Sequence, residues 1–135
     1  MRLFAGLIIL TFFFGVRSSY AESYRLVTDK HCKSRGVALV FTCEDRDSTA
    51  PGVLTVTRLP ANEWIGEEQG NRFALEVVKE DDNVLVLNYP VLYSGIATVV
   101  LVKATRRFYL TEVGYSSALQ AQSYDVEAGN FELVK

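Results

Sequence analysis

A hairpin pattern in the second half of the chain limits most strongly what the chain can fold into. Two runs rich in apolar and β-branched residues, 96–103 and 108–115, flank a short polar connection at 104–107. Runs joined by a connection of this length are typical of antiparallel strands. The second run has two alternating sets of side chains: Tyr109, Thr111, Val113 and Tyr115, and Phe108, Leu110 and Glu112. One of these two faces must lie outside or line an interior cavity.

A second hairpin is predicted around the polar turn at 80–83. Residues 72–77 alternate between apolar and polar side chains, as a half-buried strand does. Three of these side chains are expected to face the core: Phe73, Leu75 and Val77. Residues 84–87 are apolar on both faces, which indicates a central strand, and residues 88–90 are expected to end it.

The rest of the chain also favours strands over helices. Weaker strands are predicted in four further segments: 24–28, 37–42, 53–59 and 131–134. A turn at 128–130 is expected to precede the last segment, and only residues 117–122 have a helical pattern. The strands do not alternate with helices as in a parallel α/β fold. The sequence therefore predicts an all-β domain, an up-and-down antiparallel barrel or a sandwich of about seven or eight strands.

The first 21 residues have the pattern of a secretory signal peptide, which we expect to be helical. A positively charged start precedes an uncharged apolar run at 3–16, and small side chains stand at Ser19 and Ala21. Signal peptidases require small residues at these positions, so cleavage is expected after Ala21. An uncleaved anchor is disfavoured because a helix of about 14 residues spans only ~21 Å of a ~30 Å hydrocarbon core. The sequence thus predicts a signal peptide at 1–21 and a single domain at 22–135.

The mature chain is expected to be acidic. Its leader contains Arg2 and Arg17, whose removal takes the formal net charge from −2 to −4. Nucleic-acid binding needs a basic surface that neutralises phosphates, whereas an acidic domain suits a basic protein partner. No segment beyond the leader has the roughly 18 apolar residues of a membrane-spanning helix. We therefore expect a secreted or periplasmic monomer that neither binds nucleic acid nor spans a membrane.

Cys32 and Cys43 are the only two cysteines. In an oxidising compartment an even pair is most simply one disulfide, and the alternative is two free buried thiols. Bridged Cα atoms lie within ~7 Å, whereas an extended run at 37–42 would cover ~20 Å. The chain must therefore reverse direction between the two cysteines, and residues 34–36 are the expected place.

Residues suited to catalysis or metal binding are few. His31 is the sole histidine and no Gly-x-Ser-x-Gly motif occurs, so we expect His31 to be an exposed loop residue. Zinc would need ligands drawn from His31, Cys32, Cys43 and a carboxylate, which lack a recognised spacing. The acidic turns at 44–47 and 80–83 do not have the spacing of a calcium-binding EF-hand. No catalytic residue, metal or cofactor is predicted.

Aromatic residues are the strongest candidates for contact with a partner. Trp64, the only tryptophan, lies in the polar, glycine-rich segment 60–70, which we interpret as a connection. A loop tryptophan can anchor a partner, or it can fold back and close one end of the barrel. The same two interpretations apply to the other candidate contact residues: Tyr93 with the adjacent Ser94, Tyr109 and Tyr115.

The overall plan of the chain resembles the small periplasmic barrels of the C-type lysozyme inhibitors. Both have a signal peptide, short strands and a disulfide in a small mature domain. That family carries a Ser-Gly-x-x-Tyr-like loop segment, and this chain has Ser94-Gly95-Ile96-Ala97-Thr98, without the aromatic residue. The match covers two residues, and no functional role is carried over from it.

The sequence thus predicts an exported, non-enzymatic β-domain that binds an envelope or extracellular macromolecule, as an inhibitor or accessory factor. Two alternatives stay open. In the first, the chain carries a small apolar ligand, and one face of residues 96–115 lines a barrel cavity. In the second, the chain is a small hydrolase that uses paired carboxylates, which two carboxyls buried together with raised pKa values would favour.

Overall fold

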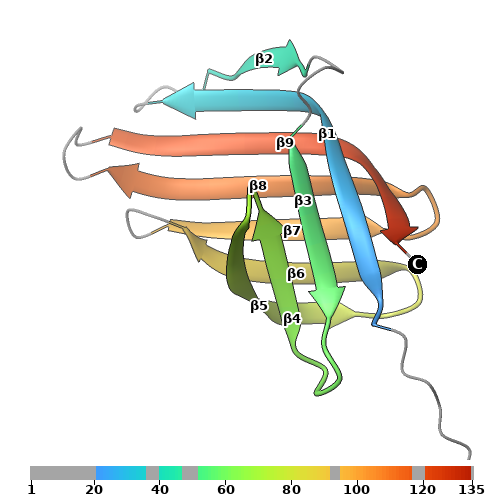
Figure 1. The fold of residues 1–135 in the computed structure, drawn as a ribbon. Helices are drawn as coiled ribbons and strands as arrows, with labels where there is room; N and C mark the ends of the chain where they lie inside the picture. The colour runs from blue at the N-terminus through green and yellow to red at the C-terminus, as the bar shows by residue number, and fades with distance from the viewer. Residues whose placement is uncertain (1–20, 36–39, 47–51, 92–94, 117–120, 135) are drawn as a thin grey trace, which may run out of the picture.

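Strands make up the regular structure in the part of the chain that the structure describes (Figure 1). The structure, a computed structural model, describes five segments: 21–35, 40–46, 52–91, 95–116 and 121–134. They contain nine strands: β1 (Ser23–Arg35), β2 (Thr42–Asp45), β3 (Val53–Arg58), β4 (Trp64–Glu68), β5 (Asn71–Glu80), β6 (Val84–Val91), β7 (Gly95–Val102), β8 (Arg107–Ser116) and β9 (Ala121–Val134). None of the described residues forms a helix with the length and apolar character needed to cross a membrane.

Eight of the strands close into an antiparallel barrel, and β2 is an extra strand. From β3 to β9 each strand pairs with the next one along the chain, and β1 pairs with both β3 and β9. The predicted all-β antiparallel barrel is confirmed, and the barrel, not the sandwich, is the architecture observed.

β1 is the strand that closes the barrel. Its first half pairs with β3 and its second half with β2, while β9 runs along its other edge over the whole length. Figure 1 shows β1 bending between these two halves. A register shift against β9 between Thr28 and Lys30 marks a β-bulge near the bend. Because a bulge bends a strand and increases its twist, it lets one strand pair with two different neighbours.

Apolar side chains fill one half of the barrel interior. The core consists of alternate residues of the strands, as the two-residue period of a strand requires: Tyr24, Leu26, Leu54, Val56, Trp64, Leu75, Leu85, Leu87, Val99, Leu101, Phe108, Leu110 and Phe131. The β7–β8 hairpin is confirmed, with its turn at residues 103–106. Phe108 and Leu110 face the core, whereas Tyr109, Val113 and Tyr115 are exposed on the outside of the barrel.

Several local predictions are wrong. The segment 60–70 contains β4, so Trp64 begins a strand and does not lie in a connection. Residues 128–130 lie inside β9 and form no turn, and residues 121–122 are strand, not helix. The remainder of the predicted helix, 117–120, lies outside the described residues. The errors at 60–70 and 128–130 share a cause, because a buried glycine, Gly66 or Gly129, stands at a position that faces the interior.

Other strands extend further than predicted or end elsewhere. Residues 34 and 35 belong to β1 and do not form the expected chain reversal, while residues 36–39 lie outside the described part of the chain. Residues 88–90 continue β6 and do not end it. Val77 is 40% exposed, not core, and a register shift between Val77 and Lys79 accompanies this change.

The predicted disulfide between Cys32 and Cys43 is present. The two residues are direct partners in the antiparallel register of β1 and β2, and their Cα atoms lie 4.0 Å apart. The bridge therefore ties the extra strand β2 to the second half of β1, the half with which β2 pairs.

Replacement of both cysteines by serine is expected to lower the free energy of unfolding by about 3 kcal/mol, because the reduced chain gains unfolded-state freedom. The barrel should still fold, since the bridge fixes β2 and not the pairing of β1 with β9. Urea denaturation followed by circular dichroism measures the loss. A double variant without β-structure in the absence of urea would show instead that β2 is required for the barrel.

Candidate functional site

The apolar core stops where inward-facing positions of β8 and β9 become polar. Along β8 the buried residues Phe108 and Leu110 are followed on the same face by Glu112. The paired strand β9 places Glu127 opposite Leu110 and Asp125 opposite Glu112. Because side chains alternate with a period of two, these carboxylates point toward the same interior as the core. One end of the barrel therefore has a polar lining, and we call it the mouth.

A cavity of about 850 Å³ opens at the mouth. Its walls come from the β4–β5 hairpin on one side and from β6, β8 and β9 on the other. The lining residues are Glu68, Gln69, Asn71, Arg72, Phe73, Tyr89, Pro90, Val91, Glu112, Gly114, Ser123 and Asp125. The barrel interior is thus filled at one end and hollow at the other.

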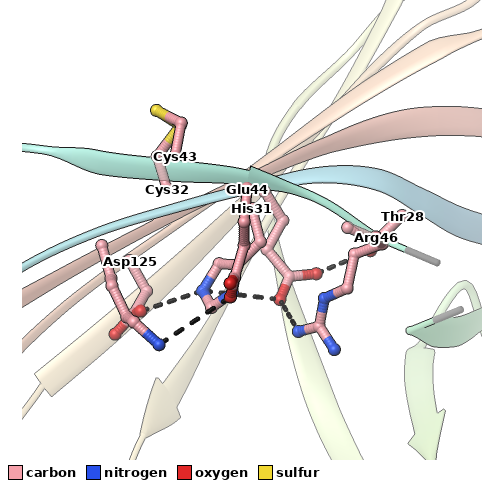
Figure 2. A network of polar contacts seen from close by, with 9 residues as sticks. Thr28, His31, Cys32, Cys43, Glu44, Arg46 and Asp125 are labelled. Atoms are coloured by element: carbon pink, nitrogen blue, oxygen red, sulfur yellow. Dashed lines mark hydrogen bonds and ion pairs between the residues drawn. A yellow bond between two sulfur atoms is a disulfide. The ribbon is translucent and has the colours of Figure 1, made fainter. Parts of the chain in front are cut away.

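His31 lies beside the mouth, in β1. Its side chain is only 14% exposed, and Nε2 lies 3.0 Å from Oδ1 of Asp125. The other ring nitrogen, Nδ1, lies 3.8 Å from Oε1 of Glu44. Figure 2 shows His31 and Asp125 on one side of β1 and β2 and the disulfide on the opposite side. The prediction of an exposed loop histidine is wrong, because the strand alternation that turns Cys32 outward turns His31 inward.

Glu127 is paired with a cation and with a hydroxyl group. Thr28 Oγ1 donates a hydrogen bond of 2.6 Å to Oε2, and Arg46 Nη2 lies 3.1 Å from Oε1 (Figure 2). Thr28 is buried, and the backbone N–H of Arg46 is held by the carbonyl of Asp29 at 3.0 Å. The bend in β1 and the residue that follows β2 therefore both fix this carboxylate.

Glu68 and Glu112 differ from Glu127 because neither has an ion-pair or hydrogen-bond partner among the described residues. Burial raises the pKa of the Glu68 carboxyl, and the charge of Glu127 raises it further while Arg46 opposes the change. Burial also raises the pKa of Glu112, with further contributions from the nearby negative charges: Asp125, Glu68 and Glu127. The mouth thus holds two carboxyls without a paired cation among the described residues: Glu112, which is half-buried, and Glu68, which is exposed at the end of β4.

The substitution Glu112→Gln is expected to stabilise the protein at pH 7, by no more than about 1 kcal/mol because water screens a half-buried charge. A raised native pKa means that the folded state binds the proton more tightly than the unfolded state. Protonated Glu112 therefore makes its full favourable contribution to the free energy of unfolding at pH values below its pKa in the unfolded state. That contribution is lost as the pH rises through its pKa in the folded state.

Thermal unfolding measured between pH 4 and pH 8 checks this expectation. The advantage of Glu112→Gln over the wild type should be largest at neutral pH and should shrink toward pH 4. The matched control is Glu76→Gln, since Glu76 is exposed on β5. An advantage that is the same at every pH would contradict the role given to the Glu112 charge.

Two aromatic rings form an apolar wall of the cavity. The ring centroids of Phe73 and Tyr89 lie 4.5 Å apart. Gly66 is the register partner of Phe73, and a Cβ atom at Gly66 would collide with the Phe73 ring. The glycine therefore lets the ring lie across β4. Burial raises the pKa of the Tyr89 hydroxyl, so Tyr89 stays a neutral donor facing the carboxylates.

The candidate contact residues predicted from sequence do not lie together. Trp64 is 2% exposed, stacks against Tyr24 with centroids 6.2 Å apart, and carries the Arg58 guanidinium 5.0 Å above its ring. A side chain buried to this extent offers no surface to a partner, so Trp64 is removed from the candidate contact residues. Tyr93 and Ser94 lie outside the described residues.

Tyr109 and Tyr115 remain candidates. Each is 46% exposed on the outer face of β8, away from the mouth cavity. Their neighbours on this face include Ile96 and Val113, which are paired in the register of β7 and β8 and are also exposed. The outside of the barrel thus carries exposed aromatic and apolar side chains separate from the polar mouth, with Arg107 beside Tyr109.

Comparison of the chain with protein-family models, with curated proteins and with solved structures finds no match. The likeness to the C-type lysozyme inhibitors at Ser94-Gly95 therefore receives no support from these comparisons. Function has to be argued from the geometry of the chain itself.

Proposed function

We propose that this chain is an exported, non-enzymatic binding protein that holds a small ligand in the mouth of its barrel. The cavity of about 850 Å³ carries the proposal, because small-molecule sites commonly have volumes of about 300–1,000 Å³ and a few converging polar groups. An eight-stranded barrel is wide enough to hold one small ligand where side chains leave its interior open. Export is supported by the leader pattern at 1–21 and by the disulfide.

The lining of the cavity favours a polar ligand over the apolar ligand of a lipid-type carrier. Glu68, Glu112 and Asp125 line the cavity together with amide and hydroxyl side chains. An apolar ligand would take water away from these carboxyls without replacing its hydrogen bonds, and that desolvation is costly. We therefore place polar groups of the ligand against β8 and β9 and its apolar part against Phe73 and Tyr89.

Glu68 and Glu112 also bear on the hydrolase alternative, since both line the cavity and both have raised pKa values. Paired carboxyls of this kind serve as acid and base in glycoside hydrolysis. We favour binding over catalysis because Glu68 is exposed at the end of β4, so the two carboxyls are not buried together. A bound compound that is cleaved by the wild type and not by the Glu68→Gln, Glu112→Gln variant would favour the hydrolase.

A macromolecular partner is the second candidate, and the outer face of β7 and β8 favours it. Tyr109, Tyr115, Val113 and Ile96 are all more than two-fifths exposed there. Tyrosine is enriched in protein–protein interfaces, where charged side chains are depleted. Replacement of Tyr109 and Tyr115 by alanine should then abolish capture of the partner while leaving the mouth cavity intact.

Native mass spectrometry of the exported protein, purified without denaturant, tests the proposed ligand. We expect a noncovalent adduct that is lost on denaturation. In the variant Ser123→Trp the new side chain would project into the cavity, since Ser123 lines it and faces Gly114, so the adduct should disappear. Thr111→Trp, on the outer face of β8, is the matched control and should keep the adduct. The absence of an adduct from the wild type, or equal adducts in the two variants, would overturn the proposal.

A further inference from the structure

The charges around the mouth cavity are unbalanced. Asp125 lies next to His31 and Glu127 next to Arg46, so two of the four carboxyls have a basic neighbour. Glu68 and Glu112 line the cavity without an ion-pair partner among the described residues. Arg72, which also lines the cavity, pairs with Glu67 at 2.7 Å instead. A ligand in the cavity therefore meets two carboxyls that no described cation pairs with directly, although the charge of Arg46 acts on Glu68 and that of His31 on Glu112.

The aromatic wall lies in the same cavity as these carboxyls. Phe73 and Tyr89 line it from β5 and β6, while Glu112 lines it from β8 and Glu68 from β4. An organic cation with a flat or apolar body satisfies both surfaces at once, because its charge pairs with carboxylates and its body packs on the rings. A bare metal ion would use the carboxylates only.

The spacing of the acidic groups also bears on the choice of cation. Calcium requires about six to eight oxygen ligands at 2.3–2.6 Å around one point. In the described part of the chain no group of three or more histidine, cysteine, aspartate or glutamate residues has the spacing to hold a metal ion. Carboxyls spread over the walls of a cavity suit a larger cation that reaches several of them.

We infer that the mouth binds an organic cation, an ammonium or amidinium-type group attached to a flat or apolar body, with Glu68 and Glu112 facing the charge and Phe73 and Tyr89 facing the body. The inference rests on the proposed ligand-binding function and adds the chemical class of the ligand. Tyr89, a neutral donor, is available for a hydrogen bond to a polar group of the ligand.

Three probes of almost the same shape test the charge of the ligand. Benzamidinium is positive, benzamide is neutral and benzoate is negative, and calcium chloride tests a metal ion. Isothermal titration calorimetry of the exported protein, after removal of any co-purified ligand, should give at least tenfold tighter binding for benzamidinium than for benzamide. Neither benzoate nor calcium is expected to bind more tightly than benzamide.

The double variant Glu68→Gln, Glu112→Gln should weaken benzamidinium at least tenfold, while the control Glu76→Gln should leave it unchanged. Equal binding of benzamidinium and benzamide, or no binding of benzamidinium, would overturn the cation inference, as would calcium binding more tightly than benzamidinium. These outcomes leave the proposed function standing, because it is judged by the adduct that Ser123→Trp abolishes. If Ser123→Trp kept the adduct, the proposed function would be overturned, even if benzamidinium bound elsewhere on the protein.

Discussion

Replacement of Trp64 by alanine is expected to lower the free energy of unfolding by about 3–5 kcal/mol. Trp64 is among the largest fully buried side chains, and its ring contacts both Tyr24 and the Arg58 guanidinium. Truncation removes its buried apolar area and leaves a cavity that the fixed strands cannot close. Because a domain of this size is stabilised by only about 5–15 kcal/mol, the loss is a large share of the total.

Urea denaturation followed by circular dichroism measures this effect. Tyr109→Ala is the matched control, since Tyr109 is an aromatic strand residue exposed on the outside, and it should cost less than about 1 kcal/mol. If Trp64→Ala does not fold, Trp64→Phe should fold with an intermediate loss. A cost for Trp64→Ala as small as that of Tyr109→Ala would contradict the placement of Trp64 in the core.

The substitution Gly129→Ala is expected to lower the free energy of unfolding by about 3 kcal/mol, nearly as much as Trp64→Ala. This value is at the upper end of the range for overpacking. Gly129 lies in β9 between Phe108 of β8 and Thr28 of β1, where the barrel closes. A Cβ atom there would collide with the backbone carbonyl of Val27 and with the Phe108 ring. Because backbone cannot rotate away as a side chain can, β1 and β9 would have to move apart.

The matched control for Gly129→Ala is Gly70→Asn. Gly70 has a φ of 82°, and a Cβ atom there would have open space around it. Asparagine tolerates this backbone region, so the substitution should cost less than about 1 kcal/mol. Thermal unfolding and amide hydrogen exchange of β1 and β9 compare the two variants. Equal stabilities would contradict the close approach of β1 and β9 at Gly129.

The sequence predicted the strands of the packed half of the barrel well. In the β7–β8 hairpin, inward residues such as Leu101 and Phe108 are apolar, so the alternation is visible without a structure. The turn at 103–106 has no large apolar residue that competes with the hairpin. Local pattern and tertiary position agree there, which is the condition under which such predictions succeed.

The strands that form the mouth were predicted poorly for a physical reason. In β9 the inward positions carry Asp125, Glu127 and Gly129, so the alternation that marks a half-buried strand is missing and only the last residues were predicted. In β4 the inward positions after Trp64 are Gly66 and Glu68, which resemble a loop. A strand that lines a polar cavity lacks the apolar periodicity of a core strand.

One signal in the sequence did point to the mouth. Glu112 shares a face with Phe108 and Leu110, which is unexpected for a charged residue unless that face changes from core to cavity along the strand. The surroundings of Glu112 were only partly predictable. Asp125 lies on the next strand along the chain, but Glu68 and His31 come from strands that are distant in the chain. Only the closure of β1 onto β9 brings His31 and Asp125 together.

The most direct test of the central claim is a two-dimensional ¹H–¹⁵N NMR titration of the exported protein with benzamidinium. The claim is that an organic cation binds in the mouth of the barrel and not on its outer face. The account predicts saturable shifts at the cavity-lining positions on β5, β6 and β9, including Phe73, Tyr89 and Ser123. Shifts confined to Tyr109 and Val113 on the outer face, or no saturable shift at all, would contradict it.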